Sequence, residues 1–130
     1  MKHHEKALLL LKKASEDEVL LDEILDSERI SDEIIGFHSQ QAVEKLLKAV
    51  LSEFGVVYRK VHDLEKLLNL ITDNKIEVPD DIKELDVLSP YAVEFRYDIL
   101  PSEAELPFDR AATRELIRKV RKWAEELIKP

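Results

Sequence analysis

Apolar and polar positions recur with helical periodicity along most of the chain. The longest such run extends from Ser31 to Gly55, and at 100° per residue it divides into distinct faces. Large apolar residues share one broad arc: Ile35, Val43, Leu46, Leu47, Val50, Leu51 and Phe54. A narrow polar stripe, spaced i, i+3, i+7 and i+10, lies on the other side: His38, Gln41, Lys45 and Lys48. Ala42 and Ala49 flank this polar stripe. We expect the rest of the chain to pack around this helix.

The segment before it predicts a first helix from about Glu5 to Asp26, because leucines and alanines recur there at three- and four-residue steps. Ser15 and Glu18 have the spacing of a capping box, which would split the helix. We expect one continuous helix, because the apolar period passes through this point without Pro or Gly. Ser31 is the expected N-cap of the second helix.

Three more helices are expected after Gly55, which has the position of a helix-ending glycine. An extended connection over residues 56–62 leads to a third helix that begins at His62 or Asp63. Residues 79–81, Pro-Asp-Asp, open a fourth, which Ser89-Pro90 interrupts. Asp109 is expected to cap the last. Short connections favour antiparallel neighbours, so the sequence predicts an all-α, up-and-down bundle of about five helices.

Composition fits one domain covering residues 1–130, long enough for a core without metals or disulfides. The chain has no cysteine, which excludes disulfides and thiolate chemistry. The net charge of −8 argues against a protein coated in nucleic acid but leaves room for a local basic site. No apolar run approaches membrane length, and the N-terminus does not resemble a signal peptide, so we expect a cytoplasmic protein. Many Lys and Glu with few Asn and Gln suggest a thermophilic source.

The polar stripe has two interpretations. In the first it is an anion or nucleotide site, with lysines supplying positive potential, Gln41 reading polar edges and His38 carrying protons. In the second it is a solvated face, on which Glu44 and Lys48 form an i, i+4 pair. The spacing is compatible with both.

Two other groups of residues invite a functional interpretation. Arg96-Tyr97 precedes a loop with two prolines, where an arginine can bind phosphate and a tyrosine can stack on a base; the alternative is an internal ion pair. Four arginines lie within one quarter of the circumference of the last helix: Arg110, Arg114, Arg118 and Arg121. They would form either an RNA-contacting stripe or a solvated face.

Other chemistry finds little support in the sequence. His62 precedes a helix, where a histidine is a cap or packed polar residue more often than a catalytic base. There is no HExxH motif, no other metal-ligand spacing and no glycine-rich phosphate loop. We therefore expect neither a metal site nor a cofactor.

Four segments together resemble one family. They are ALLLLKKASED at 7–17, FHSQQAVEKLLKAVL at 37–51, HDLEKLL at 62–68 and VEFRYD at 93–98. In this order they resemble the HEPN domain (higher eukaryotes and prokaryotes nucleotide-binding) over nearly the whole chain. The resemblance implies a small helical bundle, commonly a homodimer. It also implies that a minimal nucleotidyltransferase is encoded beside it, in a pair that behaves as a toxin–antitoxin module.

The resemblance also bears on whether this chain is an enzyme. Many HEPN proteins are metal-independent ribonucleases whose arginine is followed, after four to six residues, by a histidine. Arg96 matches the arginine, but the positions for the histidine hold Pro101, Ser102 and Glu103. None of these side chains is a natural proton carrier at neutral pH. We therefore assign no catalytic residue.

The resulting hypothesis is a nucleotide- or RNA-binding partner of a nucleotidyltransferase that does not cleave RNA. Its candidate binding residues are Gln41, Lys45, Lys48, His62, Arg96 and Tyr97. One alternative is a divergent ribonuclease in which His62 or His38 supplies the missing imidazole. A second is a purely structural dimerisation module, in which Lys45 and Lys48 lie in water.

Overall fold

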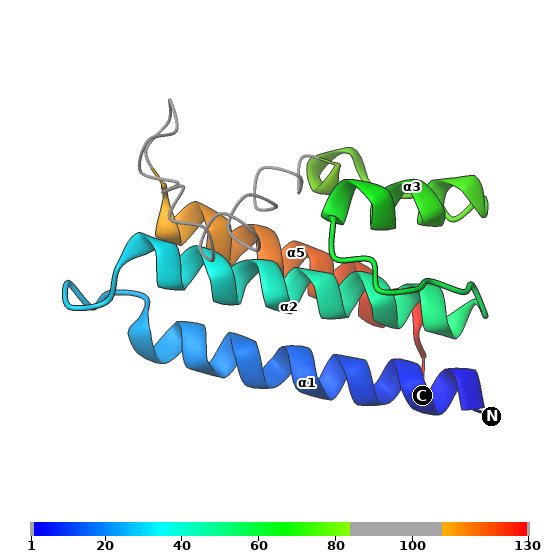
Figure 1. Ribbon diagram of the computed structural model, residues 1–130, viewed down its shortest axis with the longest axis horizontal. Coiled ribbons are helices and arrows are strands. Elements are labelled where there is room, and N and C mark those ends of the chain that lie inside the picture. Colours follow the sequence, from blue (N-terminus) through cyan, green and yellow to red (C-terminus); the bar gives the residue numbers. More distant parts are fainter. Residues whose placement is uncertain (1, 84–107, 130) are drawn as a thin grey trace.

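The computed structural model describes residues 2–83 and 108–129 (Figure 1). Within these ranges the chain forms four α-helices and one turn of 3₁₀ helix, and no strand. In chain order the elements are α1 (Lys2–Ile24), α2 (Asp32–Glu53), α3 (Leu64–Asp73), η1 (Asp80–Ile82) and α5 (Arg110–Leu127). The expected all-α class is confirmed, and the first helix is continuous as expected, although it begins and ends slightly earlier.

The expected number of about five helices is not reached among the described residues. Where a fourth helix was expected to open, the chain forms only the single turn η1. The remainder of that segment, including Arg96 and Tyr97, lies outside the described residues.

The central helix is α2, which contacts α1, α3 and α5. Six of the seven residues on its predicted apolar arc are buried, and so are Ala42 and Ala49 beside the polar stripe. The expectation that Phe54 is buried with the arc is wrong, because this residue is 50% exposed. It is the C-cap residue, at the point where α2 ends.

Antiparallel packing of α1 and α2 is visible in Figure 1 and in the pairs that join them. At one end His4 Nδ1 lies 2.7 Å from a carboxylate oxygen of Glu53. Further along, Lys45 donates to Asp17 at 2.6 Å. Pairing low numbers on α1 with high numbers on α2 is what an antiparallel hairpin of helices requires.

Local capping chemistry sets the helix ends. Side chains of Ser31, Asp63 and Asp109 accept backbone hydrogen bonds at the first turns of α2, α3 and α5. Gly55 has a φ of +69°, and the Gly55 and Val56 amides donate back to Ser52 and Leu51. This Schellman arrangement ends α2 and needs a left-handed residue, which glycine adopts without steric cost.

The contacts of the four α5 arginines contradict both interpretations given above, the RNA-contacting stripe and the solvated face. Arg110 donates to the backbone carbonyls of Leu25 and Ser27 at 2.8 and 2.9 Å, where α1 ends. Arg121 donates to Glu18 of α1 at 2.6 Å. Only Arg118, with a side chain 54% exposed, resembles a residue of a solvated face. Three of the four arginines therefore attach α5 to α1 and its following loop.

Arg114 is the most buried member of this group, with a side chain only 8% exposed. It donates to both carboxylate oxygens of Asp22, at 2.6 and 3.0 Å, and to Glu18 at 3.3 Å. The bidentate bond from Arg114 holds the pKa of the Asp22 carboxyl below its ordinary value, against a smaller opposing effect of burial. The same bond raises the pKa of Arg114.

Candidate functional site

Glu44 is the centre of the polar contacts on α2. Its side chain is 6% exposed, yet it accepts three hydrogen bonds. Gln40 Nε2 donates at 2.9 Å, Lys48 Nζ at 2.7 Å, and His62 Nδ1 lies 2.8 Å away. A buried carboxylate without such partners would be strongly destabilising. We call these four residues, Gln40, Glu44, Lys48 and His62, the Glu44 cluster.

The positions of three cluster residues follow from helix geometry. Gln40, Glu44 and Lys48 are spaced four residues apart, so they lie on one side of α2. The fourth, His62, comes from the connection between α2 and α3. With Glu44 ionised, Nδ1 of His62 carries the proton that it donates.

Gln40 fixes the backbone of that connection as well. It is fully buried, and its Nε2 also donates to the carbonyl oxygen of His62 at 3.0 Å. Gln41 in turn donates to Gln40 Oε1 at 2.9 Å. The connection is thus held to α2 immediately before Asp63, which caps α3. The cluster positions α3 as well as a polar surface.

The remaining members of the polar stripe turn towards α1. Lys45 is bound to Asp17, and Nδ1 of His38 lies 4.0 Å from another oxygen of the same carboxylate. Nδ1 of His38 is buried and has no hydrogen-bond partner among the described residues. The interpretation of the stripe as a solvated face is wrong, because α1 covers part of it and the Lys48 side chain is only 14% exposed.

The predicted site residues therefore separate into three sets. Lys48 and His62 meet at Glu44, and Gln41 adjoins them through Gln40. Lys45 is engaged by α1. Arg96 and Tyr97 lie outside the described residues, so their expected place in the cleft stays a prediction. Sequence reasoning missed Gln40 and treated Glu44 only as a surface partner of Lys48; the four-residue spacing was the available signal.

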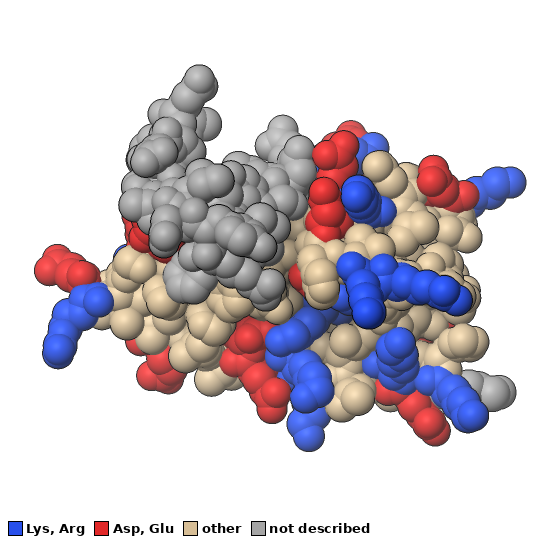
Figure 2. Space-filling view, viewed as in Figure 1, with Lys and Arg blue, Asp and Glu red and all other residues tan. Residues whose placement is uncertain are grey.

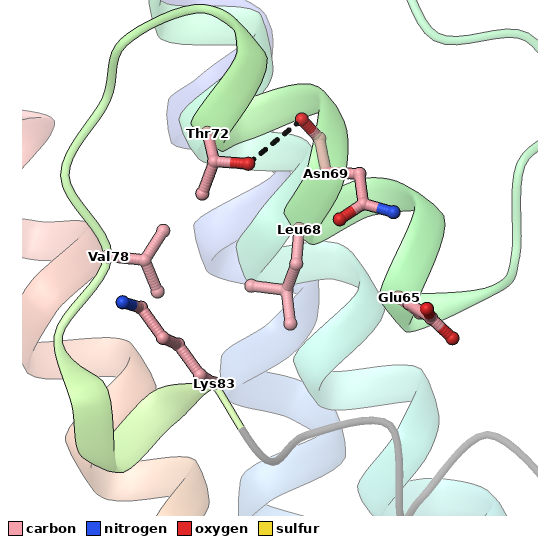
Figure 3. Close-up of a pocket in the computed structure, with 6 residues that line it drawn as sticks. All are labelled: Glu65, Leu68, Asn69, Thr72, Val78 and Lys83. Carbon is pink, nitrogen blue, oxygen red and sulfur yellow. Dashed lines mark hydrogen bonds between the residues drawn. The ribbon is translucent and has the colours of Figure 1, made fainter.

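A hollow of about 270 Å³ lies elsewhere, beside α3. Figure 3 shows its lining, with Leu68 and Val78 facing one another across it and polar side chains around them. The lining consists of Glu65, Leu68, Asn69, Thr72, Val78 and Lys83. It contains none of the candidate residues. We therefore assign it no ligand.

Two classes of site are absent from the described part of the chain. Residues 2–83 and 108–129 contain no group of three or more His, Cys, Asp or Glu that could hold a metal ion. None of the helices within these ranges is long and apolar enough to cross a membrane.

Comparison with known proteins places the chain among its relatives. The sequence profile of the HEPN domain matches residues 6–130. A protein of Methanocaldococcus jannaschii named "Putative toxin MJ1304" is 29% identical over 123 residues, which covers 95% of this chain and 79% of that protein. No solved structure matches significantly.

Proposed function

This chain belongs to the HEPN domain family, and we propose that it is the nucleotide- or RNA-associated half of a toxin–antitoxin-like pair. Its partner in this proposal is a minimal nucleotidyltransferase, and the chain itself does not cleave RNA. The name of the relative from M. jannaschii supports a role in such a pair. We place the protein in the cytoplasm, where RNA and the partner are available.

One observation carries the proposal that RNA is not cleaved. The positions separated from Arg96 by four to six residues hold Pro101, Ser102 and Glu103, and none of these can shuttle a proton at neutral pH as histidine does. Of the two histidines that could replace the missing one, His38 has its Nδ1 buried, which supports this part of the proposal.

A fluorescent single-stranded RNA tests both parts of this proposal. We expect the purified protein to bind it and to leave it intact after prolonged incubation, and to capture the nucleotidyltransferase encoded beside it. Calorimetry with ATP and AMP would measure nucleotide binding separately. Absence of binding to RNA, nucleotides and partner together would refute the proposal, and cleavage would refute its non-enzymatic part.

A divergent ribonuclease is the second candidate, and one contact favours it. The His62 side chain is 64% exposed while its Nδ1 is held by the buried Glu44, as a carboxylate orients a general base. If RNA is cleaved, His62→Ala should abolish cleavage. His4→Ala is the matched control, because His4 makes a similar bond to Glu53 at the other end of the helix pair.

A structural dimerisation module remains the third possibility. Its premise that Lys45 and Lys48 lie in water is wrong, because Lys45 pairs with Asp17 and Lys48 with Glu44. These same ion pairs give both lysines a role in the bundle, as a structural module requires. In that case Lys45→Ala and Lys48→Ala would leave RNA affinity unchanged.

The homodimer expected for this family has a candidate surface on α1. Four exposed apolar residues lie there in two pairs about three turns apart: Leu8, Leu9, Val19 and Leu20. An antiparallel second copy centred near residue 14 would set each pair against the other. Lys12 of each copy would then face Glu16 of its partner, and Glu5 would face Glu23 only at the ends of the contact, where solvent screens the repulsion.

Light scattering tests this surface. We expect the wild type to have the mass of two chains and the variant Leu9→Glu/Val19→Glu that of one, because two carboxylates would be buried in the contact. Val57→Glu is the control, since Val57 is 74% exposed on another part of the molecule. A dimeric double variant would show that α1 is not the interface.

A further inference from the structure

Tyr58 brings two lysines from different helices to one aromatic ring. The ammonium group of Lys6, on α1, lies 5.0 Å from the ring centroid, and that of Lys48, on α2, lies 5.6 Å from it. The phenol oxygen is 3.0 Å from Ser52 Oγ, so the ring itself is held against α2. The ring attracts both cations and offsets part of their mutual repulsion.

Two further cations extend this surface into solvent. Arg59 and Lys60 follow Tyr58 directly, are exposed, and form no ion pair with any residue that the structure describes. Their neighbours Val56 and Val61 pack against the core, and His62 is bound to Glu44. The connection is therefore anchored on both sides of Arg59 and Lys60. We call Lys6, Lys48, Tyr58, Arg59 and Lys60 the Tyr58 surface.

The charge distribution sets this surface apart from the rest of an acidic chain of net charge −8. Figure 2 shows Lys and Arg side chains gathered over the C-terminal half of α2, the connection that follows it and the adjoining part of α1. Two of the nearby carboxylates are already bound: Glu44 by Lys48 and His62, and Glu53 by His4. The positive charge of Lys6, Arg59 and Lys60 therefore faces solvent without an acidic partner among the described residues.

We propose that the Tyr58 surface binds the phosphate backbone of single-stranded RNA; this rests on the RNA-associated function proposed above. Lysines supply point charges for successive phosphates, and the Arg59 guanidinium can bind one phosphate through two parallel hydrogen bonds. An aromatic ring amid cations is the usual composition of a surface that binds single strands without sequence preference. Tyr58 acts as a positioning residue for Lys6 and Lys48.

A triple variant tests the proposal by salt dependence. Each phosphate contact contributes a slope of about −0.7 to the plot of log affinity against log salt concentration for single strands. Lys6→Ala/Arg59→Ala/Lys60→Ala should therefore make that negative slope shallower by about 2 and weaken binding roughly 100-fold near 0.1 M salt. The matched control removes one arginine and two lysines that are exposed elsewhere, Arg29→Ala/Lys66→Ala/Lys122→Ala, and should change affinity less than about threefold.

The outcomes separate this proposal from the broader function. If the wild type binds RNA and the triple variant binds it equally well, the Tyr58 surface is refuted while the proposed function stands. If the wild type binds no RNA, the Tyr58 surface is refuted, whereas the broader function fails only if nucleotides and the nucleotidyltransferase are not bound either. Binding of ATP and of inorganic phosphate to the triple variant is measured in parallel. If the variant loses ATP or phosphate binding while its RNA binding is unchanged, the surface is a site for free phosphates and the proposed RNA site is refuted. Loss of nucleotidyltransferase capture alone would identify a protein-docking surface and also refute it.

The ring has its own test. Tyr58→Phe keeps the aromatic face and loses only the hydroxyl bonded to Ser52, so RNA affinity should stay within about twofold. Tyr58→Leu loses the attraction for both ammonium groups, and affinity should fall roughly fivefold. Equal affinities for the Phe and Leu variants would contradict the positioning role. Circular dichroism of each variant checks that the fold is retained.

Discussion

Arg114→Ala is expected to lower the free energy of unfolding by about 3 kcal/mol, measured by urea denaturation. Removal of one partner from a buried ion pair typically costs roughly 3–5 kcal/mol, because the remaining charge is left uncompensated. We expect the lower end of that range, since Glu18 keeps its bond to Arg121 and Asp22 is about half exposed. Glu18, with a side chain 7% exposed, is the charge most affected.

Arg118→Ala is the control for that measurement. Arg118 lies one turn further along α5 and also approaches Asp22, at 3.9 Å, but its side chain is 54% exposed. Exposed pairs contribute less than about 1 kcal/mol, so this variant should be nearly as stable as the wild type. Equal losses for Arg114→Ala and Arg118→Ala would contradict the importance of burial in attaching α5 to α1.

Lowering the pH should reproduce part of the loss of stability expected for Arg114→Ala. The pKa of Asp22 is lower in the folded chain than its unfolded value of about 3.9, so its contribution to stability is present above that pH. The contribution is lost as the pH falls through the folded pKa. We therefore expect Asp22→Asn to lower stability at neutral pH and to make the decline below about pH 4 shallower than in the wild type. Parallel acid profiles would contradict this.

Glu44→Ala is expected to destabilise the protein by about 2–4 kcal/mol, because Gln40 and Lys48 lose a buried acceptor and His62 loses its partner. We expect the variant to lose stability in the connection over residues 56–63 as well as in the fold as a whole. The connection over residues 56–63 is held to α2 through this cluster, so its amides should exchange faster with deuterium in the variant. Urea denaturation and hydrogen exchange followed by mass spectrometry measure the two effects.

Two variants sharpen the Glu44 experiment. Glu44→Gln keeps an acceptor oxygen and the shape, and should lose less stability than Glu44→Ala. Glu53→Ala removes a carboxylate whose only partner among the described residues is His4, near the start of α1, and should cost less than about 1 kcal/mol. A loss for Glu44→Ala no greater than that for Glu53→Ala would show that the cluster does not hold the connection.

The sequence alone was sufficient for features that depend on near neighbours in the chain. Ser31 and Asp109 cap the helices they were expected to cap, and Gly55 ends α2 with a positive φ. Capping bonds join residues two or three positions apart, and the period of the apolar arc predicts which side of the helix is buried. The pairing of Glu44 with Lys48 was visible for the same reason, as an i, i+4 spacing on one helix.

Contacts between distant segments were decided only by the tertiary structure. Periodicity placed Arg114 and Arg121 on one side of a helix, but could not show that Glu18, about 100 positions earlier, lies opposite both. In the same way, His62 joins Glu44 because the connection folds back over α2. A charged side chain looks the same in sequence whether water or a carboxylate faces it, and only the packing of the helices determines which one does.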